Sequence, residues 1–221
     1  MSSSNFKQDL FTQFARVGKA LSNGNRLELL EFIAQGERSV DELAKVSGLT
    51  VANTSQHLQH LRQAGLVSNR KEGLKVYYQL SGDDVIQLLG GLRIVAERNI
   101  AEVDKLVNTF LTVKDQLEPI PREELLARVK HGLVTVLDVR PAEEYAAGHV
   151  PGAINVPLNR LQTHLAAFDG SEEVVAYCRG PHCILAFDAV AQCRKRGIKA
   201  QRLEDGFPEW KLAGLPVEKL P

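Results

Sequence analysis

The chain has 221 residues, enough for two ordinary domains, and its 44% hydrophobic and 24% charged residues are typical of a globular protein. No segment has the apolar length of a membrane span and the N-terminus lacks the apolar core of a secretory signal, so we expect a cytoplasmic protein. The net charge is zero, but residues 45–75 carry five basic side chains and one acid, a local patch of the kind that a DNA footprint requires.

The first half of the chain is predicted to be mainly α-helical with one hairpin. Apolar residues at helical spacing mark a helix over 6–21, and Asn-Gly at 23–24 separates it from a second helix that ends near Gly36. Ser39 and Glu42 form a capping-box signature for a short third helix. The remaining elements are a turn at 48–50, a fourth helix ending before Gly65, strands at 66–70 and 75–80 joined across 71–74, and a long fifth helix over 83–111.

The third and fourth helices form a helix-turn-helix, and the basic hairpin that follows makes it winged. In the fourth helix Leu58 and Leu61 are predicted to be buried with Thr54, which leaves polar side chains outward for reading the major groove. Cations on the wing suit phosphate contacts, which add affinity without sequence information. The predicted DNA-binding residues are Thr50, Asn53, Ser55, Gln56, His57, His60 and Arg62 on the helix, with Arg70, Lys71 and Lys75 on the wing.

Two segments, LSNGNRLELL at 21–30 and SQHLQHLRQAGLV at 55–67, resemble the ArsR family of bacterial repressors, over roughly residues 6–112. The resemblance implies that residues 50–62 contact a double-stranded DNA operator. It also implies a homodimer in which the first and fifth helices pack across a two-fold axis. We therefore assign residues 1–112 to a DNA-binding and dimerisation domain.

Hydrophobic periodicity in the fifth helix supports the dimer independently, because this helix is longer than one small domain needs. The alternative is that the apolar stripe packs on its own domain, and the Gly90-Gly91 pair within the helix allows close packing in either case. The stripe consists of Val85, Leu89, Leu92, Ala96, Ile100, Val103, Val107 and Phe110.

Many ArsR-family members sense metals through cysteines on the third helix or His and acidic clusters on the fifth. Here the third helix has no cysteine and the fifth has neither His nor Cys, so we expect no metal at these positions. His57 and His60 lack a third ligand and make a poor metal site. We expect no cofactor.

A polar segment with two prolines, residues 113–120, is the predicted linker, and residues 121–221 form a second domain. Strands are predicted at 134–139 and 173–178, and the second strand leads through the loop CRGPHC at 178–183 into a helix at 184–195. The backbone amides at this helix start favour a thiolate or a persulfide at Cys178. Since the three cysteines are odd in number and lack framework spacing, we expect thiols rather than a disulfide scaffold.

The second half resembles rhodanese domains over residues 121–221, which implies an α/β fold with a central parallel sheet after the mainly α winged domain. The matching segments are LDVRPAEEY at 137–145, AGHVPGAINVP at 147–157, the 178–183 loop, and DGFPEWKLAGLPV at 205–217. The resemblance implies that Cys178 is the catalytic nucleophile, which carries sulfane sulfur as a persulfide, and that residues 179–183 are its sulfur-binding loop: Arg179, Gly180, Pro181, His182 and Cys183.

The loop departs from the rhodanese pattern. Its glycine is third rather than fourth and its sixth residue is Cys183, while Pro181 removes one N–H donor, so sulfur binding is better supported than thiosulfate turnover. A phosphatase of this fold would need arginine where Ile184 stands, which disfavours phosphate or arsenate chemistry.

Several side chains keep two interpretations. Cys183 is a resolving thiol for a modified Cys178 or a small buried residue at a helix start. His182 favours the thiolate as a cation or faces solvent, and Arg179 steers an anionic donor or is a solvated charge. A zinc site at Cys178, His182 and Cys183 lacks a fourth ligand. We expect structural roles for Asp138, Arg140 and His149 and a core position for Cys193.

Three functions follow from these domains. In the first, the protein is a regulator, expected to be a repressor, in which sulfur loaded on Cys178 from thiosulfate, polysulfide or a low-molecular-weight persulfide is the signal. In the second, it is a sulfurtransferase enzyme with an appended DNA-binding domain. In the third, it is a regulator whose rhodanese half is a catalytically inactive interaction module.

Overall fold

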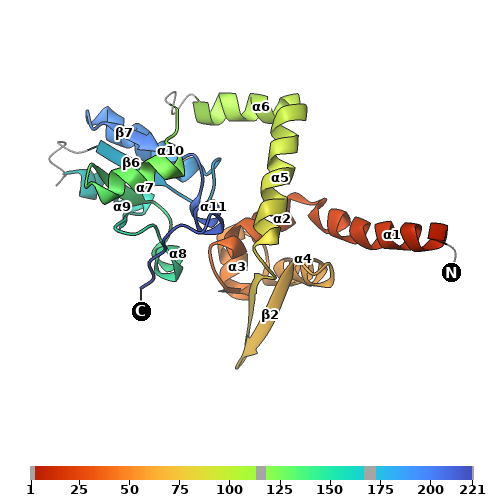
Figure 1. Ribbon diagram of the computed structural model, residues 1–221. Coiled ribbons are helices and arrows are strands. Elements are labelled where there is room, and N and C mark those ends of the chain that lie inside the picture. The colour runs from red at the N-terminus through yellow and green to blue at the C-terminus, as the bar shows by residue number, and fades with distance from the viewer. Residues whose placement is uncertain (1–2, 113–117, 167–172, 221) are drawn as a thin grey trace. The chain divides into compact units, whose positions relative to one another are not determined.

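A computed structural model describes residues 3–112, 118–166 and 173–220 of the chain (Figure 1). The chain divides into two compact units, Met1–Gly90 and Gly91–Pro221. Within the predicted linker, residues 113–117 lie outside the described part of the chain. Ile120, which was also assigned to the linker, forms a parallel bridge with Leu203 and is part of the second unit.

The first unit is a winged helix-turn-helix, as predicted. Its sheet is antiparallel in the order β1-β3-β2, and the β2–β3 hairpin extends beyond helices α3 and α4 as the wing (Figure 1). The elements are α1 (Ser3–Leu21), α2 (Gly24–Ala34), β1 (Arg38–Ser39), α3 (Val40–Ser47), α4 (Val51–Gln63), β2 (Val67–Glu72), β3 (Lys75–Leu80) and the start of α5 (Asp84–Asn99).

Local capping fixes where the helices of the DNA-reading motif begin and end. The Ser39 side chain accepts a hydrogen bond from the Glu42 backbone N–H, while the Glu42 carboxylate accepts one from the Ser39 N–H at 2.7 Å. This reciprocal capping box lowers the pKa of Glu42, chiefly through the Ser39 backbone hydrogen bond. Helix α3 ends at Gly48 in the left-handed region (φ 71°), and Thr50 caps α4 by accepting from the Asn53 N–H at 3.2 Å.

The wing is longer than predicted. Residues 71–74 are the predicted connection, but Lys71 pairs with Val76 and Glu72 with Lys75 in the antiparallel register. Only Gly73 and Leu74 form the turn, and Gly73 has a positive φ of 59° that suits a tight hairpin turn.

The prediction of one continuous helix over 83–111 is wrong. Helix α5 stops at Asn99, Ile100 has extended backbone (φ −115°, ψ 103°), and the chain continues as α6 (Ala101–Val107) and the π-helical turn η1 (Asn108–Thr112). The Asn99 side-chain amide donates to the Val95 carbonyl at 2.8 Å, and both asparagine and β-branched isoleucine have low helix propensity. The hydrogen-bonded α-helix therefore ends before Ile100, although the apolar periodicity of the sequence continues.

The apolar stripe of α5 is divided in burial as well. Val85 is buried in the core of the first unit and Leu89 packs against that core, as the own-domain interpretation predicts. Leu92, the next residue of the stripe, is 40% exposed, and its neighbours outside the stripe, Ile94 and Val95, are 45% and 60% exposed. Within the single chain, a Cβ at Gly90 or Gly91 would meet no described atom within 4 Å, so the glycine pair makes no close contact with its own domain.

The second unit contains a four-stranded parallel sheet in the order β5-β4-β6-β7, which confirms the predicted α/β fold. The strands are β4 (Val134–Asp138), β5 (Ile154–Asn155), β6 (Glu173–Tyr177) and β7 (Ala200–Arg202). The helices that pack with them are α7 (Arg122–Lys130), α8 (Ala142–Ala147), α9 (Leu158–Ala166), α10 (Ile184–Lys195) and α11 (Phe207–Leu212).

Side-chain alternation along the strands builds a core on each face of the sheet. Val174 and Ala176 of β6 belong to one buried cluster with residues of α9 and α10. Val175 and Tyr177 belong to another, which contains Leu125 of α7 and Trp210 of α11. In the described residues, no helix combines the length and the apolar character that crossing a membrane requires.

We predict that Ser39→Ala lowers the free energy of unfolding by about 1 kcal/mol, because α3 loses its N-cap acceptor. Urea denaturation followed by circular dichroism measures the change. Glu42→Gln, which keeps a side-chain acceptor for the Ser39 N–H, is the companion variant. An unchanged midpoint for Ser39→Ala would show that the capping box does not stabilise the folded state.

Candidate functional site

Helix α4 presents the predicted polar face to solvent. Thr54, Leu58 and Leu61 are buried, while Asn53 and Gln56 are exposed. His60 and Arg62 are exposed as well, Ser55 is half-buried, and the Thr50 hydroxyl caps the helix. The structure thus brings together on one helix a set of donors and acceptors of the kind that base-edge readout uses.

His57 differs from its neighbours on α4. Its side chain is half-buried, and its Nδ1 atom is buried without a hydrogen-bond partner among the described residues. Desolvation lowers the pKa of His57, so its imidazole is neutral at physiological pH.

On the wing, Arg70 is occupied by carboxylates of its own chain. Its Nε donates to both Glu37 oxygens at 2.8 and 2.9 Å, Nη2 donates to Glu37 Oε2 at 2.6 Å, and Nη1 donates to Glu72. Its guanidinium also lies 4.6 Å from the ring centroid of Tyr77. These carboxylates raise the pKa of Arg70, but they also compete with a DNA phosphate for its donors. Lys71 and Lys75 are exposed on the same hairpin.

In the second unit, the predicted reactive loop joins β6 to α10. Cys178 follows the last residue of β6, and Cys183 is the N-cap of α10 and makes no side-chain capping bond. The two cysteines form a disulfide, with their Cα atoms 6.1 Å apart. The expectation of thiols throughout is therefore wrong for this pair, because the chain reversal at 179–182 brings the two sulfurs together.

Burial separates the three cysteines. Cys178 is 1% exposed and belongs to the core cluster on one face of the sheet, whereas Cys183 is only partly buried and packs at the edge of that cluster. Cys178 is the predicted reactive sulfur of the loop, but in the structure it is sealed from solvent within the disulfide. Cys193 is fully buried, and burial raises the pKa of its thiol to about 11, which agrees with the predicted core position.

Arg179 braces the loop instead of facing solvent or a donor. Its Nε donates to both Glu144 oxygens at 3.0 Å and its Nη2 donates to Glu144 Oε1 at 2.6 Å. Glu144, on α8, is 1% exposed, so the pair is largely desolvated. Neither interpretation of Arg179 from the sequence anticipated this ion pair. Desolvation also lowers the pKa of His182, so a cationic imidazole is disfavoured there.

Gly206 allows a second segment to hold the loop. A Cβ at this position would overlap the Arg179 carbonyl group and the Gly180 amide nitrogen. The adjacent Phe207 N–H donates to the Cys178 carbonyl at 3.0 Å. Only glycine permits this backbone approach. Gly206 lies in the DGFPEW part of the rhodanese-like pattern, but no role was predicted for it from the sequence.

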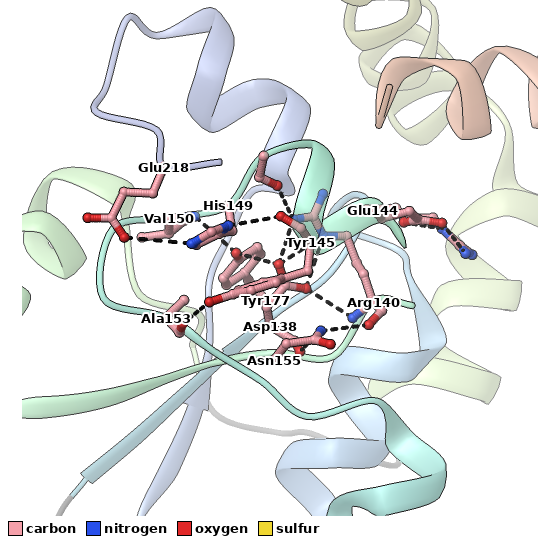
Figure 2. A network of polar contacts seen from close by, with 12 residues as sticks. Asp138, Arg140, Glu144, Tyr145, His149, Val150, Ala153, Asn155, Tyr177 and Glu218 are labelled. Carbon is pink, nitrogen blue, oxygen red and sulfur yellow. Dashed lines mark hydrogen bonds and ion pairs between the residues drawn. The ribbon is translucent and has the colours of Figure 1, made fainter. Parts of the chain in front are cut away.

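A buried polar network lies at the carboxyl ends of β4 and β6 (Figure 2). Arg140 and Asp138 are fully buried and form an ion pair with an Nη2–Oδ2 distance of 2.5 Å, and the Tyr177 hydroxyl donates to Asp138 at 2.6 Å. Arg140 also donates to the Gly148 carbonyl at 2.7 Å. Burial raises the pKa of Tyr177 well above its usual value, so the hydroxyl remains a donor. Asp138 and Arg140 therefore brace the fold, as expected from the sequence.

His149 anchors the C-terminal segment. Its Nδ1 donates to the Tyr145 carbonyl at 2.9 Å and its ring stacks on Tyr145 with centroids 3.7 Å apart. Its backbone pairs with Glu218, whose carboxylate lies 3.6 Å from His149 Nε2 (Figure 2). His149 is 3% exposed, and this arrangement agrees with the structural role predicted for it.

Two family models match the chain. The bacterial regulatory protein arsR family matches residues 23–69, and the rhodanese-like domain matches residues 121–213. The chain is 46% identical over 213 residues to the HTH-type transcriptional regulator Rv0324 of Mycobacterium tuberculosis. This match covers 96% of this chain and 93% of that protein. It is 37% identical over 90 residues to a probable mercury resistance operon repressor of Streptomyces lividans, covering 41% of this chain and 72% of the repressor.

Among solved structures, the chain is similar to the homodimeric winged helix-turn-helix DNA-binding domain of Mb0332 from Mycobacterium bovis, a possible ArsR-family regulator. The identity is 42%, the TM-score is 0.42, and the match covers 45% of this chain and 93% of that one.

We predict that Glu37→Gln tightens DNA binding because it removes the charge that holds Arg70 Nε and Nη2, while Nη1 keeps its bond to Glu72. The slope of log K against log salt should steepen by up to about 0.9, the value for one additional phosphate contact. Fluorescence anisotropy with a duplex at several salt concentrations measures both quantities. Lys71→Gln is the matched control and should change both in the opposite direction. A Glu37→Gln variant that binds more weakly would show that the pair positions the wing for binding and does not compete with phosphate.

We predict that Gly206→Ala lowers the free energy of unfolding by about 1–3 kcal/mol, because the new methyl group displaces the backbone at Arg179 and Gly180. Gly91→Ala is the control, since its Cβ meets open space within a helix. Denaturant unfolding of both variants under oxidising conditions provides the comparison. Equal stability of Gly206→Ala and the wild type would contradict the close backbone approach.

Proposed function

Because the chain belongs to the ArsR family of HTH-type transcriptional regulators and carries a C-terminal rhodanese-like domain, we propose that sulfane sulfur is its signal. Cys178 takes up the sulfur as a persulfide, Cys183 resolves it, and the resulting change in the pair alters operator binding. The observation that carries this proposal is the disulfide between the two cysteines of one six-residue loop.

The chemistry needs no oxidant other than the sulfur donor. The Cys178 thiolate attacks the outer sulfur of a persulfide RSSH, a polysulfide or thiosulfate; with RSSH, the thiol RSH leaves and Cys178–S–SH remains. The Cys183 thiolate then attacks Cys178 Sγ and expels hydrosulfide, forming the disulfide. The two thiols lose two electrons and the sulfane sulfur gains them as sulfide. The Cα separation of 6.1 Å lies within the range that disulfides span.

DNA binding is assigned to α4 and the wing, where Asn53, Gln56 and His60 read base edges and Lys71 and Lys75 contact phosphates. We propose repression as the outcome, which the similarity to the mercury resistance operon repressor supports. Coupling requires that the reduced and oxidised loops stabilise operator-binding and non-binding states differently.

A homodimer is proposed because apolar side chains of α1 are exposed in the single chain. Three of them, Phe6, Phe11 and Phe14, are 55–62% exposed. Contact of these rings with water is unfavourable, and a second copy of the chain would remove it by burying them. The exposed Leu92, Ile94 and Val95 of α5 provide further apolar surface of the same kind. A two-fold dimer would read two operator half-sites related by the same symmetry.

The test is operator binding with and without polysulfide by the full-length wild type, Cys178→Ser and the control Cys193→Ser, starting from reduced protein. We expect polysulfide to weaken binding by the wild type and by Cys193→Ser about tenfold, within the usual range of allosteric coupling. Cys178→Ser should bind DNA and not respond.

The other results separate the alternatives. Unchanged binding together with cyanide-dependent thiocyanate release would favour a sulfurtransferase appended to a DNA-binding domain. The absence of both effects, with no change in operator binding and no thiocyanate release, would favour an inactive rhodanese module. Two features weigh against turnover: Pro181 removes an amide donor from the loop, and Cys178 is buried in the oxidised state.

A further inference from the structure

We propose that the Cys178–Cys183 disulfide is itself a sulfur acceptor, that Cys183 is the sulfur attacked, and that a persulfide extends the link to a trisulfide. The idea rests on the proposed function, because it concerns the fate of the oxidised loop when the sulfur donor persists. It reverses the roles in the oxidised state: Cys183 is the electrophile that receives sulfur and Cys178 is the leaving group.

Unequal burial selects the sulfur that is attacked. Thiol–disulfide exchange depends on access to each sulfur, and the nucleophile approaches opposite the bond that breaks. Cys178 is 1% exposed within the core cluster, whereas Cys183 is partly buried and lies between exposed His182 and Ile184. A nucleophile arriving from solvent therefore meets Cys183 Sγ, with Cys178 on the interior side as the leaving group.

The leaving thiolate is held where it can react again. The Phe207 N–H fixes the Cys178 carbonyl, and Gly206 lies against the backbone of the next two residues. Cys183 remains the N-cap of α10, a helix of 12 residues whose N-terminal dipole favours an anion nearby. The cysteine pair thus stays close after the bond opens.

The two steps balance without a further oxidant. The persulfide anion RSS⁻ attacks Cys183 Sγ, which forms Cys183–S–S–SR and releases the Cys178 thiolate. That thiolate attacks the transferred sulfur, the atom bonded to Cys183 Sγ, and expels RS⁻, which closes Cys178–S–S–S–Cys183. The RS⁻ anion takes up the proton of the original persulfide. One sulfane sulfur is transferred and no net electrons move.

Charge in the loop favours a persulfide over thiosulfate as the donor. Arg179 is the one Lys or Arg within residues 178–183, and it is bound to buried Glu144 through three short contacts. Glu97, Arg93 and Arg202 act on His182 from outside the loop, but within the loop the one cation is already engaged, so a dianion finds little compensation there for its desolvation. A low-molecular-weight persulfide carries one charge and presents an accessible sulfur nucleophile, so we assign this class as the substrate.

Trypsin separates the two cysteines for the test, because cleavage after Arg160, Arg179 and Arg194 places Cys178 in peptide 161–179 and Cys183 in peptide 180–194. Full-length protein is oxidised with diamide and treated in separate samples with glutathione, glutathione persulfide or thiosulfate. Each sample is quenched in acid, alkylated and digested for mass spectrometry. Fragmentation distinguishes Cys183 from Cys193 in the shared peptide, and Cys193→Ser repeats the assignment.

With glutathione, we expect the mixed disulfide on Cys183 and the alkyl label on Cys178. With glutathione persulfide, we expect the two peptides to be linked with about 32 Da added to the disulfide mass, and the addition to be lost on reduction. Thiosulfate should give little of this product. Glutathione found on Cys178 or equally on both cysteines, or a disulfide that opens without trisulfide formation, would overturn the inference.

The outcome is separable from that of the proposed function. If the trisulfide forms but operator binding does not respond to sulfur, the signalling proposal fails and the chemical inference stands. If operator binding responds while the glutathione adduct is on Cys178, the signalling proposal stands and this inference is wrong.

Discussion

The bond between Cys178 and Cys183 is the interaction on which the chemistry of this protein depends. It joins the carboxyl end of the central strand β6 to the first turn of α10, so any change in the bond acts at the junction of two core elements. A loop tethered only at its ends could absorb such a change without consequence. Here the backbone around Cys178 is fixed, and opening or extending the link must alter the loop between the two cysteines.

That fixation comes from packing and polar contacts on several sides. Arg179 is bound to Glu144 of α8, and Phe207 of α11 donates to the Cys178 carbonyl. At the carboxyl ends of β4 and β6, the Asp138–Arg140 pair and the Tyr177 hydroxyl satisfy one another in the interior, where an unpaired charge would be costly (Figure 2). These contacts fix the backbone at Cys178 and Arg179, where the loop leaves β6.

Much of the fold was predictable because it depends on local signals. Ser39 and Glu42 are three residues apart, and the capping box they form is visible in the sequence. The strand that precedes Cys178 and the helix after Cys183 follow from short apolar runs and the loop between them. By contrast, the break at Ile100 opposes a continuous apolar periodicity, and only the modest propensities of Asn99 and Ile100 indicate it.

The candidate site was predicted less completely, because its decisive partners lie far apart in the chain. Arg70 was assigned to phosphate, yet its partner Glu37 is 33 residues away, and Arg179 is paired with Glu144 35 residues away. Periodicity and motif spacing carry no information on such pairs. Gly206 belongs to the same class, since its role is defined by the backbone of a loop that is distant in sequence.

Counting thiols after exposure to sulfur tests the central claim most directly. Reduced full-length protein is treated with polysulfide, freed of the reagent, denatured and alkylated, and its intact mass is measured with and without prior reduction. The account predicts one alkylated thiol without reduction, at Cys193, and three after it. Three alkylated thiols without reduction, or a product linked between chains, would contradict a sulfur-driven link within the loop.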